Sequence, residues 1–166
     1  VPFAELLNRF YRVAVDIVID RDGLVDKFVG DEVVAIFAPG WAGPHHAARA
    51  IEAADALLRA TGHGVGREPW LPVGAGVHTG VAYVGTVGAA GVVTDFTALG
   101  DPVNAAARLA SAAPAGQVLV SAAAATSAGL DTTGLEATAQ DLRGRTETMA
   151  VFTLPAGSTG SRIPHE

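Results

Sequence analysis

The chain contains no cysteine, one methionine, and only 11 lysine and arginine residues among its 166 positions. The absence of cysteine excludes disulfide bonds, thiolate nucleophiles and cysteine-based zinc sites, and it agrees with a cytoplasmic location. Asp and Glu number 17, so the net charge is −6, and the basic residues form no cluster. Because duplex binding needs a concentrated cationic face, nucleic acid is not expected as a partner. A single nucleotide is still compatible, since a few cations and metal ions can neutralise one triphosphate.

Long hydrophobic runs are also absent. Hydrophobic residues make up 49% of the chain and the mean hydropathy is +0.34, but much of this is alanine. No stretch approaches the roughly 18 to 20 consecutive apolar residues of a membrane-spanning helix. We therefore expect no membrane segment and no secretory signal. The length predicts one domain with a hydrophobic core.

Hydrophobic periodicity predicts helices that alternate with short hairpins. The expected helices cover residues 3–20, 44–62 and 101–112, and a fourth begins after Ser121 as its cap. Short strands are expected within residues 24–28, 32–37, 73–87, 92–99, 117–120, 135–143 and 146–154. This order favours an α+β domain, a mixed β-sheet with helices packed on it, over a doubly wound parallel sheet. Residues 155–166, with their Gly, Ser and Pro, are predicted to be a mobile tail.

The first chemically distinctive segment is a predicted hairpin tip. Lys27 lies in the strand before it, and the tip itself carries Gly30 and Asp31. A carboxylate next to a glycine, which lets a ligand approach the backbone closely, can hold Mg²⁺ or Mn²⁺. Taken alone, the segment is equally compatible with a solvated acidic turn.

The second segment lies at the start of the third predicted helix, for which Asp101 is the expected N-cap and Pro102 the first helical residue. Asn104 and Arg108 are four positions apart, so both project from one face of this helix. The neighbouring alanines leave that face open to a close partner. An amide and a guanidinium there can contact a sugar and a phosphate together. An ordinary polar helix face is the alternative.

In combination and in this order, the Lys-x-x-Gly-Asp and Asn-x-x-x-Arg elements resemble the class III adenylyl and guanylyl cyclases. The likeness includes residues 6–10, 27–31, 76–80 and 97–108 and continues to the last hairpin. It implies a cyclase catalytic domain over residues 1–154 with a ferredoxin-like mixed sheet. The implied reaction converts ATP to cyclic AMP and pyrophosphate.

The resemblance also implies a role for each matching residue. Asp31 corresponds to one of two aspartates that hold two Mg²⁺ or Mn²⁺ ions. Asn104 orients the ribose, and Arg108 stabilises charge on the α-phosphate as pyrophosphate leaves. Lys27 and Thr97 select adenine, as in the subgroup of adenylyl cyclases with this Lys and Thr pair. The Thr97 hydroxyl can accept from the adenine 6-amino group and donate elsewhere.

A head-to-tail homodimer is implied as well, with the metal aspartates and Lys27 from one subunit and Asn104 and Arg108 from the other. Membership of the Lys and Thr subgroup suggests regulation by bicarbonate. Arg143 and Arg145 fall near a basic position that grips the terminal phosphates in relatives.

The family's other metal aspartate has no counterpart here. It lies on a strand before the first helix, so we expect that first strand to be missing, which would leave the domain N-terminally incomplete and expose an edge of the sheet. Asp16 and Asp20 do not replace it, because they lie on or at the end of the helix. The explanations are a truncated domain, a degenerate cyclase-like module, or a rearranged site with one aspartate. The alternative function is therefore an inactive regulatory or dimerisation module.

A diguanylate cyclase is a further alternative, because Gly30, Asp31 and Glu32 are similar to the Gly-Gly-Asp/Glu-Glu-Phe signature. The other glycine of that signature is absent, because Val29 precedes Gly30. The block from Thr97 to Arg108 has no counterpart in that family either, so the sequence favours the class III reading.

Overall fold

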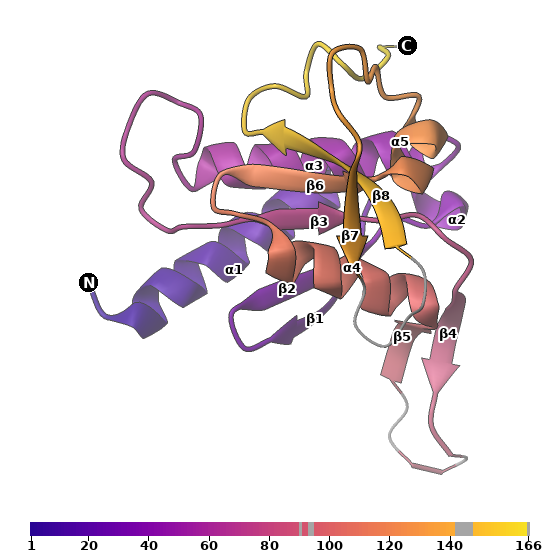
Figure 1. Ribbon diagram of the computed structural model, residues 1–166. Helices are drawn as coiled ribbons and strands as arrows, with labels where there is room; N and C mark the ends of the chain where they lie inside the picture. Colours follow the sequence, from indigo (N-terminus) through magenta and orange to yellow (C-terminus); the bar gives the residue numbers. More distant parts are fainter. Residues whose placement is uncertain (90, 93–94, 142–147, 166) are drawn as a thin grey trace.

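A computed structural model describes residues 1–89, 91–92, 95–141 and 148–165. Its helices are α1 (Phe3–Asp20), α2 (Pro39–Ala42), α3 (His46–Ala60), α4 (Asp101–Ala112) and α5 (Ala122–Ala128). Its strands are β1 (Leu24–Val29), β2 (Glu32–Ile36), β3 (Ala75–Val77), β4 (Tyr83–Val87), β5 (Asp95–Leu99), β6 (Gln117–Ser121), β7 (Thr138–Asp141) and β8 (Thr148–Pro155) (Figure 1). The α+β class predicted from the sequence is confirmed.

The strands form three separate sheets within the described ranges. The largest has the order β3-β6-β8-β7, in which β3 runs parallel to β6 and the other pairs are antiparallel. β1 and β2 form a hairpin, and β4 and β5 form an antiparallel ribbon that projects from the body of the domain (Figure 1). In the four-stranded sheet β3 lies at one edge and β7 at the other.

The core is built on both faces of β6, whose side chains alternate as a strand requires. Val118 and Val120 face a large apolar cluster that contains Ile51 of α3. Leu119 points the other way and packs with Leu109 of α4. The four-stranded sheet is thus covered by α3 on one side and by α4 on the other. Burial of each such side chain stabilises the fold by about 1.5–3 kcal/mol.

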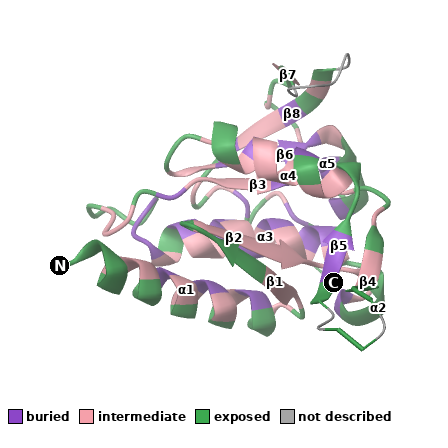
Figure 2. Cartoon of the chain, turned by 90° about the horizontal axis from the view of Figure 1, so that it is seen from below, coloured by how far each residue is buried: buried purple, intermediate pink, exposed green. Residues whose placement is uncertain are grey.

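Helix α1 adds an outer layer and is amphipathic. Phe10, Ala14 and Val18, spaced by four, are its buried residues, whereas its outer side is exposed (Figure 2). Phe10 belongs to the same apolar cluster as Ile51, so α1 lies against α3. Among the described residues, no helix combines the length and the apolar character needed to cross a membrane.

Several element boundaries differ from those predicted, and one helix was not predicted. The short helix α2 begins at Pro39, in keeping with the preference of proline for the first helical turn. The second long helix was expected from Pro44 and begins at His46 instead.

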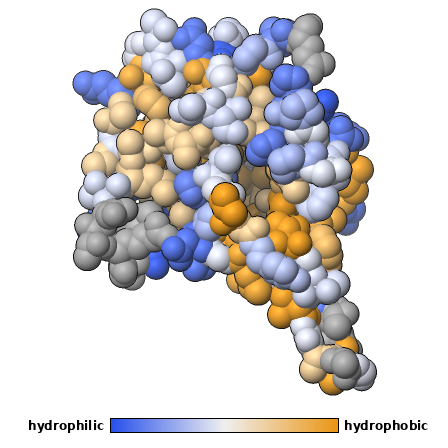
Figure 3. All heavy atoms as spheres, turned by 90° about the vertical axis from the view of Figure 1, so that its right-hand side faces the viewer, coloured by the Kyte–Doolittle hydropathy of each residue, from blue (hydrophilic) through white to orange (hydrophobic). Residues whose placement is uncertain are grey.

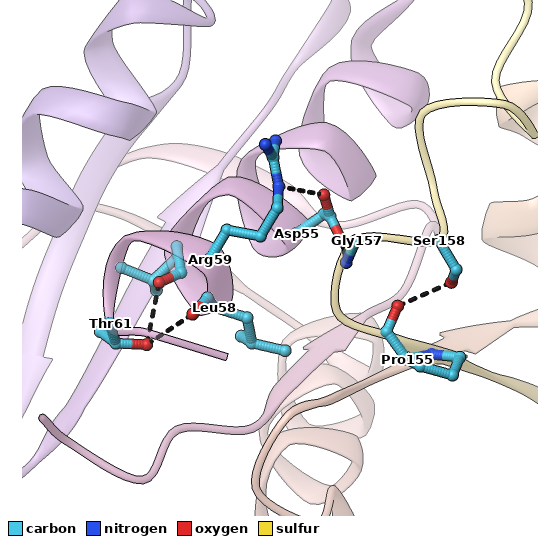
Figure 4. A network of polar contacts seen from close by, with 8 residues as sticks. Asp55, Leu58, Arg59, Thr61, Pro155, Gly157 and Ser158 are labelled. Carbon is cyan, nitrogen blue, oxygen red and sulfur yellow. Dashed lines mark hydrogen bonds and ion pairs between the residues drawn. The ribbon is translucent and has the colours of Figure 1, made fainter. Parts of the chain in front are cut away.

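The segment after β8 is held against the domain. Asp55, buried on α3, accepts a hydrogen bond from the Gly157 N–H at 2.7 Å and one from the Arg59 Nε at 2.8 Å (Figure 4). Ile163 is 4% exposed and belongs to the main core. Composition predicted a mobile tail here; the described part of it instead has a buried apolar anchor and a partner in Asp55.

Candidate active site

The β1–β2 hairpin presents Asp31 at its tip. Gly30 before it has φ +59°, in the left-handed region that favours glycine. Tyr11 of α1 donates its hydroxyl to the Gly30 carbonyl, and its ring lies 4.3 Å, centroid to centroid, from that of Phe28. Helix α1 therefore holds the hairpin tip in place, and Asp31 is exposed there.

A β-bulge lies in β1 just before Lys27. Val25 pairs with Ala35 and Lys27 pairs with Val34, so Asp26 is an extra residue without a partner position on β2. Neighbouring side chains of a regular strand point to opposite faces, and a bulge changes that direction. Asp26 Oδ2 lies 3.4 Å from Lys27 Nζ, with the Asp26 side chain 1% exposed and that of Lys27 44% exposed.

Thr97 on β5 reaches the same carboxylate. Its hydroxyl donates to Asp26 Oδ2 over 3.0 Å, and the residue is buried, 8% exposed. Lys27 and Thr97, which the resemblance to class III cyclases implied as a pair, are thus brought together through Asp26. Sequence reasoning missed Asp26; its only signal was an aspartate, a residue depleted in strands, inside an otherwise apolar β-prone run.

Strand β5 leads directly into the helix that carries the other predicted site residues. Gly100, with φ +131°, is the N-cap of α4, and no side chain of the described residues forms a cap hydrogen bond there. The expectation that Asp101 is the N-cap is wrong: Asp101 is the first residue inside the helix, where its negative charge suits the helix dipole. Asn104 is exposed one turn before the partly buried Arg108.

Arg108 carries an unsatisfied donor. Its Nη1 is buried and has no hydrogen-bond partner among the described residues. A guanidinium is always charged, and a buried donor normally has a partner. An anionic group is the ligand that would best satisfy it. Packing fixes the helix, because a Cβ at Gly76 of β3 would lie 2.4 Å from the Ala110 nitrogen.

The structure does not bring together the other groups that were predicted to bind metal ions or the terminal phosphates. Within the part of the chain that the structure describes, no group of three or more His, Cys, Asp or Glu side chains could hold a metal ion. Asp31 supplies one carboxylate, which does not by itself complete a site for two ions. Arg143 and Arg145 lie outside the described residues.

Lys27 and Thr97 lie close together within one chain. The resemblance implied that Lys27 acts beside the metal aspartate of its own protomer. In the structure Lys27 shares Asp26 with Thr97 of the same chain. Lys27 therefore lies close to β5, the strand that leads to the helix with Asn104.

The projecting β4–β5 arm carries exposed apolar residues along its surface (Figure 3). Those on it or next to it are Val81, Tyr83, Val87, Val92, Phe96 and Leu99. Phe96 also lies 6.2 Å, between ring centroids, from the partly exposed Trp41. Contiguous exposed apolar surface is typical of interaction sites.

Comparisons with known proteins agree with this architecture. The family model described as "Adenylate and Guanylate cyclase catalytic domain" matches residues 3–154. Two uncharacterized proteins of Mycobacterium tuberculosis are similar: Rv1319c, 40% identical over 106 residues (63% of this chain, 19% of that protein), and Rv1320c, 41% identical over 112 residues (65% and 19%). The chain thus spans about a fifth of the length of these relatives.

Solved structures give the same fold. The guanylyl cyclase Cya2 superposes with a TM-score of 0.72 at 21% identity, over 96% of this chain and 84% of that one. The adenylyl cyclase CyaB from P. aeruginosa has a TM-score of 0.68 at 25% identity, over 90% and 80%. The fold and the paired site segments define a nucleotide cyclase architecture. The chain belongs to the adenylate and guanylate cyclase catalytic domain family.

Proposed function

We propose that this chain is the catalytic part of an adenylyl cyclase that converts ATP to cyclic AMP and pyrophosphate. The observation that carries the proposal is the buried, unpaired Nη1 of Arg108, on the helix that also carries Asn104. Helix α4 begins directly after β5, and Thr97 on that strand meets Lys27 at Asp26. Groups suited to a phosphate, a sugar and a base thus follow one another along a short part of the structure.

The chemistry assigned to these residues is positioning and electrostatic stabilisation. The ribose 3′-oxygen attacks the α-phosphorus, its proton is lost, and the bond to pyrophosphate breaks. Asn104 orients the ribose so that this attack is in line. Arg108 donates to the α-phosphate oxygens as charge develops on them. Asp31 is assigned as a ligand of Mg²⁺ or Mn²⁺, and a complete site for two such ions stays a prediction.

A homodimer is part of the proposal, and the exposed apolar arm supports it. We assign Lys27, Thr97, Asn104 and Arg108 to one protomer and Asp31 to its partner, because Lys27 is joined to Thr97 within one chain. A cytoplasmic location is proposed together with it, and regulation by bicarbonate stays a prediction.

One observation favours a second candidate, an inactive regulatory or dimerisation module. Asp31, exposed at the tip of the β1–β2 hairpin, is the one residue of this chain that matches a metal aspartate of the family. Such a module would bind a nucleotide, or only a partner, without turnover.

Product analysis separates the two. The chain is incubated with ATP or GTP and Mn²⁺, and cyclic AMP, cyclic GMP and pyrophosphate are quantified. We expect cyclic AMP from ATP, and a fall of about 100-fold in Arg108→Ala. The matched control is Arg67→Ala, an exposed arginine in the loop between α3 and β3, which should retain the wild-type rate. ATP binding without product would favour the module, and absence of ATP binding would contradict the cyclase proposal.

A further inference from the structure

Asp26 is a buried carboxylate in an unusual setting. It is the extra residue of a β-bulge, its side chain is 1% exposed, and its Oδ2 is shared by Lys27 and Thr97. Its Oδ1 is buried and has no hydrogen-bond partner among the described residues. A buried oxygen without a partner destabilises a fold, and an apolar side chain would avoid that penalty. The stability of β1 therefore does not explain this aspartate.

The hydrogen bond from Thr97 has a chemical consequence. A threonine hydroxyl owns one proton and can either donate or accept toward a ligand. Here the proton is directed at Asp26 Oδ2, over 3.0 Å. An ionised carboxylate accepts only, so the bond has one direction. Thr97 is left with lone pairs alone to offer a ligand, and its hydroxyl becomes an obligate acceptor.

The ion pair with Asp26 leaves Lys27 as a hydrogen-bond donor, whereas Thr97 is left as an acceptor. Its ammonium has three protons and no lone pair, and the ion pair with Asp26 at 3.4 Å uses only part of that capacity. The Lys27 side chain is 44% exposed, so its remaining protons can reach a ligand. Asp26 thus holds a fixed acceptor and a fixed donor next to each other.

We propose that Asp26 is a positioning residue that sets the purine preference of the site by orienting Thr97 and Lys27. Adenine presents a donor, the 6-amino group, beside an acceptor, N1. Guanine presents the reverse, an acceptor at O6 beside a donor at N1. The acceptor and donor that Asp26 holds match adenine and oppose guanine. This inference rests on the proposed function and adds to it the origin of base selectivity.

A purely structural role makes a different prediction. If Asp26 only links β1 to β5, its replacement lowers stability and weakens both nucleotides alike. If it orients the pair, Asp26→Asn releases the Thr97 hydroxyl, because an amide both donates and accepts. The discrimination between bases then falls, a change that lost stability alone does not produce.

The experiment is equilibrium binding to the full 166-residue chain, measured by calorimetry with Mn²⁺, of the α,β-methylene analogues of ATP and GTP, which cannot release pyrophosphate. The readout is the ratio of the Kd for the GTP analogue to the Kd for the ATP analogue. We expect Asp26→Asn to lower this ratio about tenfold, the scale of a hydrogen bond or two. Asp55→Asn is the matched control, since Asp55 is also buried and paired but lies on α3 with Arg59 and Gly157. It should leave the ratio unchanged.

Thr97 variants test the same point if Asp26→Asn does not fold. Thr97→Val should lose the preference for ATP, and Thr97→Ser, which keeps the hydroxyl, should retain it. In the Thr97→Val background Asp26→Asn should change the ratio less than in the wild type. An unchanged ratio in Asp26→Asn or in Thr97→Val overturns the role of Asp26 and leaves the cyclase proposal standing. A wild type that binds neither nucleotide overturns the proposed function, and the role of Asp26 with it.

Discussion

Thr97 and Asp26 are joined by a 3.0 Å hydrogen bond across 71 positions of the sequence. The bond connects the β4–β5 arm to the β1–β2 hairpin, two ribbons that share no backbone ladder in the described residues. Because α4 follows β5 immediately, the bond also relates the hairpin to the helix with Asn104 and Arg108. One buried carboxylate therefore links the parts of the site.

This link predicts a stability effect at Thr97. Thr97→Val keeps the shape of the side chain but removes the donor to Asp26, whose other oxygen already lacks a partner. We expect the free energy of unfolding to fall by about 1–3 kcal/mol, measured by urea denaturation. Thr148→Val, at an exposed position of β8, should change it by less than about 0.5 kcal/mol. Equal effects at the two threonines would contradict the assignment.

The close contact between β3 and α4 gives a second prediction. In Gly76→Ala the new Cβ would lie 2.4 Å from the Ala110 nitrogen, so the helix must shift. We expect a loss of about 1–3 kcal/mol in stability and a lower rate of cyclic AMP formation, because α4 carries Asn104 and Arg108.

The control for that substitution is Gly40→Ala. An added Cβ at Gly40 in α2 meets nothing within 4 Å, and its φ is not positive. This change should be neutral or slightly stabilising in the same denaturation experiment. A neutral Gly76→Ala would show that β3 and α4 are not in close contact.

Asp131 gives a prediction for pH dependence. Its pKa lies below the ordinary 3.8, chiefly because the Thr133 side chain and then the Thr133 backbone N–H donate to it, with a smaller contribution from the Arg162 charge. A depressed folded-state pKa contributes stability that is present above pH 3.8 and is lost as the pH falls through the folded value. Asp131→Asn should therefore lose less stability than wild type between about pH 6 and about pH 2.5.

Thr133→Ala tests the cause of that shift. It removes the side-chain donor but keeps the backbone N–H, which lies 3.0 Å from Asp131 Oδ1. Its loss of stability on acidification should fall between those of wild type and Asp131→Asn. Three identical Tm profiles against pH would contradict the assignment.

Much of the fold was predictable because the spacing of apolar residues along the chain clearly indicates its main helices and strands. Helix α1 has the predicted bounds, and Ser121 caps α5 through a hydrogen bond from the Ala124 N–H, as expected. The first and last residues of the helices and strands were harder to predict. Asp101 has the chemistry of an N-cap, yet Gly100 takes that place because a positive φ is needed where β5 turns into α4.

The site was predictable only in its separate parts. The resemblance to class III cyclases indicated Lys27 and Thr97 as a pair, but Asp26, which joins them, depends on a β-bulge. A bulge shifts the strand by one residue and has no reliable pattern in a single sequence. The buried state of Arg108 Nη1 likewise depends on packing between α4 and its neighbours, which local sequence does not encode.

The central claim, a cyclase site shared between two protomers, is tested most directly by mixing two inactive variants. Asp31→Ala and Arg108→Ala are prepared separately, combined under conditions that exchange protomers, and assayed for cyclic AMP from ATP. A mixed dimer has one intact site of two, and about half of randomly paired dimers are mixed. The account predicts about a quarter of the wild-type rate in the mixture. A mixture no more active than the two variants alone, beside an active wild type, would contradict it.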